Sequence, residues 1–230
     1  PGEWRRIANL LVENRRVRLR DAWPRWWDIE GEKERLEAGY CLLSQFLEPG
    51  PPERDLKKLL DDLAEEYRAA QARPDVFSLA EFLFRSKGMR GADSAKYYDP
   101  LNSSLFHVIE RRRGLPISLA AVYMLIGHRL GFVIEGCNFP GHFLARVRTQ
   151  GRTLLVDCFH GGRFFEDKEI LRTHAGPTKA LRELIHGRMS TEIILGRALR
   201  NLISAYEKAE EPHDRRLMAD LLGMLESQGT

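Results

Sequence analysis

Two polar residues in the middle of the chain, His142 and Asp157, could act together as a base and the acid that orients it. His142 opens a segment of alternating apolar residues, and Asp157 ends the next such segment. Both segments are expected to be strands, and Gln150-Gly151 between them predicts a hairpin turn. His142 and Asp157 would then lie at the same end of the hairpin. An imidazole held by a carboxylate can take a proton from a thiol or a hydroxyl.

The sequence motifs around these residues resemble those of the SirB-type branch of the transglutaminase-like superfamily. The resemblance is carried by residues 97–103 (YYDPLNS), 110–119 (ERRRGLPISL) and 139–144 (FPGHFL). It implies an α+β, papain-like core in which an antiparallel sheet packs on a central helix, with helices flanking it at both ends. It also implies a Cys-His-Asp site in which His142 and Asp157 occupy the last two places. A similar domain occurs in an F-box ubiquitin-ligase adaptor.

The cysteine of that site has no counterpart in this chain. Members with activity carry Gly-x-Cys at the start of the central helix, and counting back from Gly131 along an ungapped helix places Pro116 there. Proline is suited to the first turn of a helix but cannot be a nucleophile. We therefore expect a non-catalytic protein that binds or regulates a protein partner. The alternative is an amide hydrolase or acyltransferase that uses Ser118 or a nearby cysteine with His142 and Asp157.

Each substitute nucleophile also has an ordinary structural interpretation. Ser118 lies in the first helical turn, where serine usually bonds to the backbone. Cys137 and Cys158 flank the histidine and the aspartate, and small buried thiols are usually inert. The set Cys137, His142, Cys158 and His160 lacks the paired spacing of a zinc site. We expect neither a metal nor a cofactor.

A few residues outside the triad could line a ligand cleft; they are Tyr98, Asp99, Asn102, Arg113 and Pro116. Each of the polar ones has an alternative role. Tyr98 could fill the underside of its loop, and Asp99 could form the turn before Pro100. Asn102 could cap the next helix, and Arg113 could complement the dipole at the end of that helix.

The N-terminal 30 residues combine arginines with tryptophans. Trp4, Ile7 and Leu10 are spaced as in an amphipathic helix. The arginines interleaved with Trp23, Trp26 and Trp27 could contact nucleic acid, or the tryptophans could pack this helix onto the core while the arginines stay in water. Packing is the interpretation we favour.

The composition is that of an ordinary globular protein: 230 residues, 43% hydrophobic, 30% charged and a net charge of +3. We predict a helical region over residues 1–73, the core over 74–176 and a tetratricopeptide-like helical segment over 177–230. No apolar run reaches the roughly 20 residues that a membrane span needs. Three scattered cysteines do not form a disulfide framework, so a cytoplasmic location is expected. The oligomeric state is left open.

Overall fold

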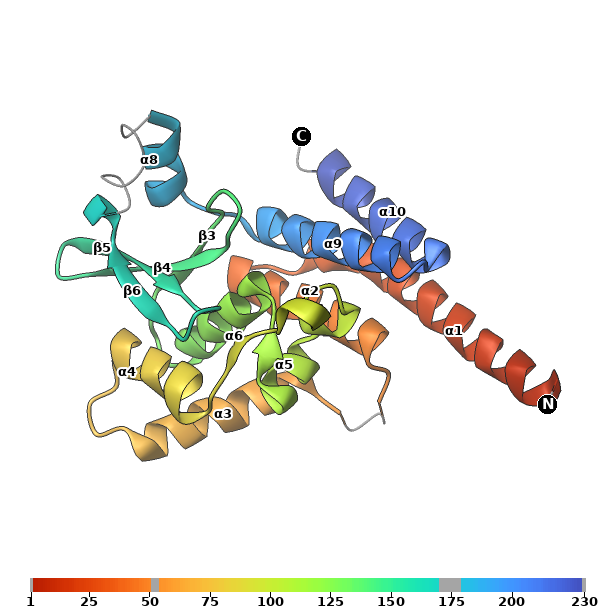
Figure 1. Ribbon diagram of the computed structural model, residues 1–230, viewed down its shortest axis with the longest axis horizontal. Coiled ribbons are helices and arrows are strands. Elements are labelled where there is room, and N and C mark those ends of the chain that lie inside the picture. The colour runs from red at the N-terminus through yellow and green to blue at the C-terminus, as the bar shows by residue number, and fades with distance from the viewer. Residues whose placement is uncertain (1, 51–53, 170–178, 229–230) are drawn as a thin grey trace.

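The structure is a computed structural model that describes residues 2–50, 54–169 and 179–228. Within these ranges, helices surround a four-stranded antiparallel sheet of order β3-β4-β5-β6, and the predicted α+β fold is confirmed (Figure 1). The helices are α1 (Gly2–Ala22), α2 (Glu32–Leu47), α3 (Leu56–Ala70), α4 (Val76–Ala80), α5 (Leu105–Arg111), α6 (Pro116–Arg129), α8 (Lys179–His186), α9 (Thr191–Lys208) and α10 (Pro212–Gln228). The strands are β1 (Arg90–Gly91), β2 (Arg113–Gly114), β3 (Ile134–Cys137), β4 (Leu144–Thr149), β5 (Arg152–Asp157) and β6 (Arg163–Glu166).

Helix α6 is the central element of the core. Pro116 begins it, where the missing proline N–H costs no hydrogen bond, and the extended Leu115 precedes it. Apolar and small residues cover every face of the helix, so all of its residues from Pro116 to Gly127 except Met124 are buried. Gly131, with φ +77°, lies just past its end. The helix therefore gives the sheet and the surrounding helices a common apolar surface to pack on.

Successive residues of β4 and of the second half of β5 are buried on both faces of the sheet. Phe143, Ala145 and Val147 of the β4 segment belong to the main core, together with α6. Leu144 and Leu155 point the other way and form a second cluster with Ile185 of α8. A strand covered on both sides can therefore carry apolar residues at successive positions, and β4 is buried from Leu144 through Val147.

The helices from the two ends of the chain lie side by side, with α1 against α2 and α10, and α9 against α2 (Figure 1). Trp23 and Trp26 are almost completely buried between them, and the Trp26 indole N–H donates to the Arg35 carbonyl. Arg16 of α1 pairs with Asp214 of α10 at 2.6 Å. These tryptophans therefore pack on the core, as favoured from the sequence, and nucleic-acid contact by the arginines stays the untested alternative.

The first three turns of α1 extend past the other helices (Figure 1). Trp4, Leu10 and Leu11 are each more than 60% exposed there, although their spacing is the amphipathic one expected. The predicted boundary at residues 176 and 177 lies outside the described residues. In the part of the chain that the structure describes, no helix has the length and the hydrophobicity that a membrane crossing requires.

Candidate functional site

His142 lies in the turn that leads into β4, not in the strand itself, which differs from the sequence prediction. Its backbone N–H donates to the Phe139 carbonyl at 3.1 Å, and Gly141 before it takes φ +73°. Pro140 and Gly141 therefore form a tight turn, and pairing with β3 begins only at Leu144. The imidazole leaves this turn about one quarter exposed, at the edge of the sheet.

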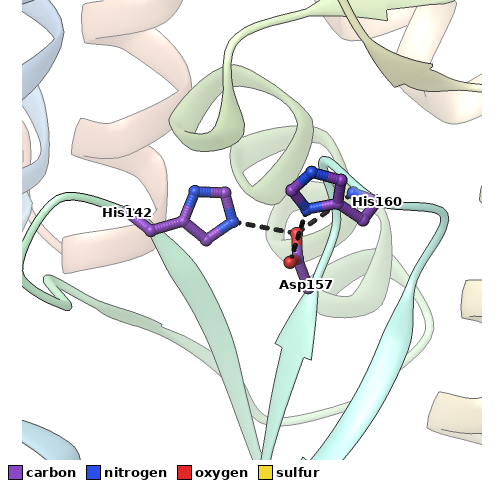
Figure 2. Close-up of side chains that lie close together, drawn as sticks. All are labelled: His142, Asp157 and His160. Carbon is purple, nitrogen blue, oxygen red and sulfur yellow. Dashed lines mark hydrogen bonds and ion pairs between the residues drawn. The ribbon is translucent and has the colours of Figure 1, made fainter.

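Asp157 ends β5 and holds both neighbouring histidines (Figure 2). Its Oδ1 accepts hydrogen bonds from His142 Nε2 at 2.9 Å and from the backbone N–H groups of Phe159 and His160 at 3.1 Å. Its Oδ2 is 2.8 Å from His160 Nδ1. Burial raises the pKa of this carboxyl, but the hydrogen bonds from His142 and His160 outweigh that effect and lower the pKa to about 2. Asp157 is therefore an ionised acceptor that fixes the ring of His142.

The turn after Asp157 is attached to the start of α6 through β1 and β2. The Phe159 carbonyl accepts from Gly91 N–H at 2.9 Å, and Gly91 pairs with Gly114, two residues before Pro116. Gly91 leaves no room for a side chain, because a Cβ there would lie 2.4 Å from the Phe159 ring. The start of α6, the turn that carries His142 and the turn that follows Asp157 therefore lie together at one edge of the core.

Comparison with known families shows which family the chain belongs to. The family model described as transglutaminase-like superfamily matches residues 53–200, which is more than half of the chain. The chain belongs to the transglutaminase-like superfamily.

Curated relatives of this transglutaminase-like chain include bacterial and animal proteins. It is 39% identical over 132 residues to a UPF0162 protein of Xylella fastidiosa, covering 54% of this chain and 46% of that protein. It is 32% identical over 182 residues to a UPF0162 protein of Pseudomonas aeruginosa, covering 77% of this chain and 66% of that protein. It is 32% identical over 139 residues to human F-box only protein 21, covering 56% of this chain and 21% of that protein. The chain thus spans about half the length of the first of these relatives, and no solved structure matches it significantly.

The residues weighed as nucleophiles lie in the interior of this transglutaminase-like chain. Pro116 is buried at the first position of α6, and Ser118 Oγ is buried with no hydrogen-bond partner among the described residues. Cys158 Sγ contacts the Val156 carbonyl, and Cys137 Sγ contacts the Leu184 carbonyl. Burial raises the pKa of both thiols. Within the described residues, the hydrogen-bonding partner of the His142 ring is Asp157, and no thiol or hydroxyl bonds to it.

A continuous series of aromatic rings leads away from the histidine. The His142 and Phe159 rings lie 6.0 Å apart, Phe159 and Tyr97 6.2 Å, and Tyr97 and Tyr98 5.4 Å, measured between centroids. Tyr98 is 47% exposed, and Lys208 of α9 lies 4.6 Å from its ring centroid. We call Tyr97, Tyr98, Phe159 and His142 the aromatic surface.

Two of the other predicted binding residues, Asp99 and Asn102, support the loop that carries Tyr97 and Tyr98, whereas Arg113 bonds elsewhere. Asp99 caps the short helix that follows it, accepting from the Leu101 N–H at 3.0 Å. The buried Asn102 donates its side-chain amide to the carbonyls of Lys96 and Tyr97. Arg113 donates to the Arg112 carbonyl at 2.8 Å. A direct role of these three side chains in binding stays a prediction.

In the sequence, His160 stands out only as a member of a candidate zinc set that includes Cys137 and Cys158. The structure separates that set, because Cys137 is buried in the second apolar cluster and Cys158 in the main core. His160 itself stays beside Asp157 with its side chain 61% exposed. The spacing Asp157-x-x-His160 could have indicated that the two side chains are neighbours. A tight turn after a strand brings the side chain three residues later back to the end of that strand.

Arg197 of α9 holds the turn that presents His142. It donates to Asn138 Oδ1 and to the Phe139 carbonyl, the same oxygen that accepts from His142 N–H. Its guanidinium also lies 5.6 Å from the Phe143 ring centroid. Arg197 is therefore a positioning residue for the histidine.

We expect Arg197→Ala to destabilise the fold by about 1 kcal/mol and to speed amide exchange at His142, because the turn loses its charged donor. Urea unfolding and amide hydrogen exchange measure the two effects. Arg200→Ala is the matched control on the same helix, since Arg200 pairs with Glu226 at an exposed position among the described residues. Equal exchange rates at His142 in both variants would contradict the assigned role.

Proposed function

We propose that this transglutaminase-like protein is a non-catalytic module that binds a protein partner through the aromatic surface beside His142 and Asp157. The observation that carries the proposal is the interior location of each candidate nucleophile. Ser118, Cys137 and Cys158 are all buried, and the described hydrogen bonds of the thiols go to backbone carbonyls rather than to His142. A base without an attacking atom cannot perform covalent acyl transfer.

The aromatic surface supports binding of a protein segment. Tyrosine combines a large apolar ring with a hydroxyl and loses little entropy when it becomes fixed, which is why it is common at protein interfaces. Tyr97 and Tyr98 are both exposed, and the cation of Lys208 lies over the ring of Tyr98. We also infer that the protein is cytoplasmic, given three free cysteines, and that it belongs to the SirB-type branch with tetratricopeptide-like C-terminal helices.

One observation favours the alternative, an amide hydrolase or acyltransferase. His142 uses Nε2 for Asp157, which leaves Nδ1 as the atom that could accept a proton. In this alternative Ser118 or a cysteine becomes accessible when a substrate binds.

Two measurements distinguish the functions. A photo-crosslinking residue at position 98 should capture a partner from a cell extract, and Phe159→Ala should reduce the capture. The same crosslinker at position 77, an exposed aromatic position on α4, is the control.

The second measurement is covalent labelling with iodoacetamide and with a fluorophosphonate. We expect that any labelling by either reagent is the same in the parent and in His142→Ala. Labelling of Ser118 or a cysteine that disappears in His142→Ala would instead establish the enzyme.

A further inference from the structure

His142, Asp157 and His160 bring three potential metal ligands to one point. The ring nitrogens of the two histidines and a carboxylate oxygen of Asp157 all lie within 4.8 Å of one another. Figure 2 shows both imidazoles directed at the carboxylate, and their ring centroids lie 5.6 Å apart. The binding proposal uses His142 and Asp157 but leaves His160 without a role.

The residue types suit a divalent transition metal. Two imidazoles and one carboxylate bind zinc in hydrolases and iron in non-haem oxygenases, with the remaining coordination positions open. The nitrogen-to-oxygen distances of 2.9 Å from His142 and 2.8 Å from His160 are close to the separation of about 3 Å between neighbouring ligand atoms around such an ion. The two contacts go to different oxygens of Asp157, and the three ligand atoms are spread over up to 4.8 Å, so the rings would move closer together as a metal replaced the two histidine protons.

The surroundings of the three side chains are compatible with metal binding. The backbone N–H groups of Phe159 and His160 hold Asp157 Oδ1, which fixes the carboxylate as outer-shell donors do. The Asp157 side chain is 12% exposed, whereas the rings of His142 and His160 are 25% and 61% exposed. The anionic ligand is thus shielded, and the histidine side is open for an ion to enter and for a water or a partner group to bind.

We propose that His142, Asp157 and His160 bind one divalent transition-metal ion of the Zn²⁺ class. The His142 nitrogen that faces Asp157 would then ligate the ion, so metal binding and acid–base catalysis by this pair exclude each other. This proposal does not depend on the binding function proposed above.

The test uses the full chain without an affinity tag, freed of metal by a chelator and then dialysed. Titration with Zn²⁺ in a calorimeter should give one site per chain, and Co²⁺ should produce the visible absorption of a nitrogen- and oxygen-ligated ion. His160→Asn should weaken binding about 100-fold or more. The His160→Asn substitution removes one exposed ligand and leaves the hydrogen bond between His142 and Asp157 in place, so this variant should fold.

His213→Asn, at an exposed histidine on α10, is the matched control and should bind as the parent does. Absence of a stoichiometric site would overturn the proposal. So would His160→Asn binding as tightly as His213→Asn, because the ion would then be held elsewhere, for example by thiols. Crosslinking at position 98 in the presence of chelator reports on the binding function separately.

Discussion

Asp157→Asn should lower the free energy of unfolding by about 2 kcal/mol at pH 7, and the difference from the parent should shrink as the pH falls toward 2. The carboxyl has a pKa of about 2 in the folded protein, against 3.8 as the ordinary value. A shift of one unit corresponds to about 1.4 kcal/mol. A pKa that folding lowers gives stability that is complete above the unfolded pKa and is lost as the pH falls through the folded one.

Urea unfolding from pH 7 to pH 2, with chelator present throughout, measures this dependence. Asp93→Asn is the control, because Asp93 is exposed and its replacement should change the free energy by less than about 0.5 kcal/mol. A loss in Asp157→Asn that stays constant down to pH 2 would show that the shape of the side chain matters rather than its charge. The carboxylate would then not be the charged anchor of the two histidines.

The main parts of this site could be predicted because each depends on local sequence. Gln150-Gly151 sets the hairpin, and the hairpin register places the residues before β4 beside the residues after β5. Pro116 and Gly131 bracket the central helix by their backbone preferences alone. The proximity of His142 and Asp157 follows from these few turn and cap residues.

Other features depended on contacts between segments that are distant in the chain. His142 alternates correctly with the residues of β4, but the turn held by Arg197, 55 residues away, keeps it out of the strand. Arg146 has the alternation of a residue facing solvent, yet α8 covers that face and buries it completely. Periodicity reports which residues share a face, but not whether another element later covers that face.

Glu135→Ala should destabilise the protein by about 3 kcal/mol, because it leaves the buried guanidinium of Arg146 without its counter-charge. Glu135 Oε2 accepts from Arg146 Nη2 at 3.1 Å, and the Arg146 side chain is fully buried. Among the described residues, the remaining hydrogen-bond partner of Arg146 is the Ile185 carbonyl of α8, at 2.6 Å. Thermal and urea unfolding measure the loss. Arg148→Ala is the control, since Arg148 bonds to the same Glu135 oxygen from an exposed position and should cost less than about 1 kcal/mol.

The double variant Glu135→Ala with Arg146→Met separates the charge from the packing. Methionine fills much of the volume of the arginine stem and removes the uncompensated charge, so it should recover most of the stability that Glu135→Ala loses. If the double variant is instead less stable than Glu135→Ala, the hydrogen bond from Arg146 to the Ile185 carbonyl helps to attach α8 to the sheet, in addition to the apolar cluster around Ile185. In that case α8 should also become accessible to proteases in the double variant and stay protected in Glu135→Ala, which limited proteolysis would show directly.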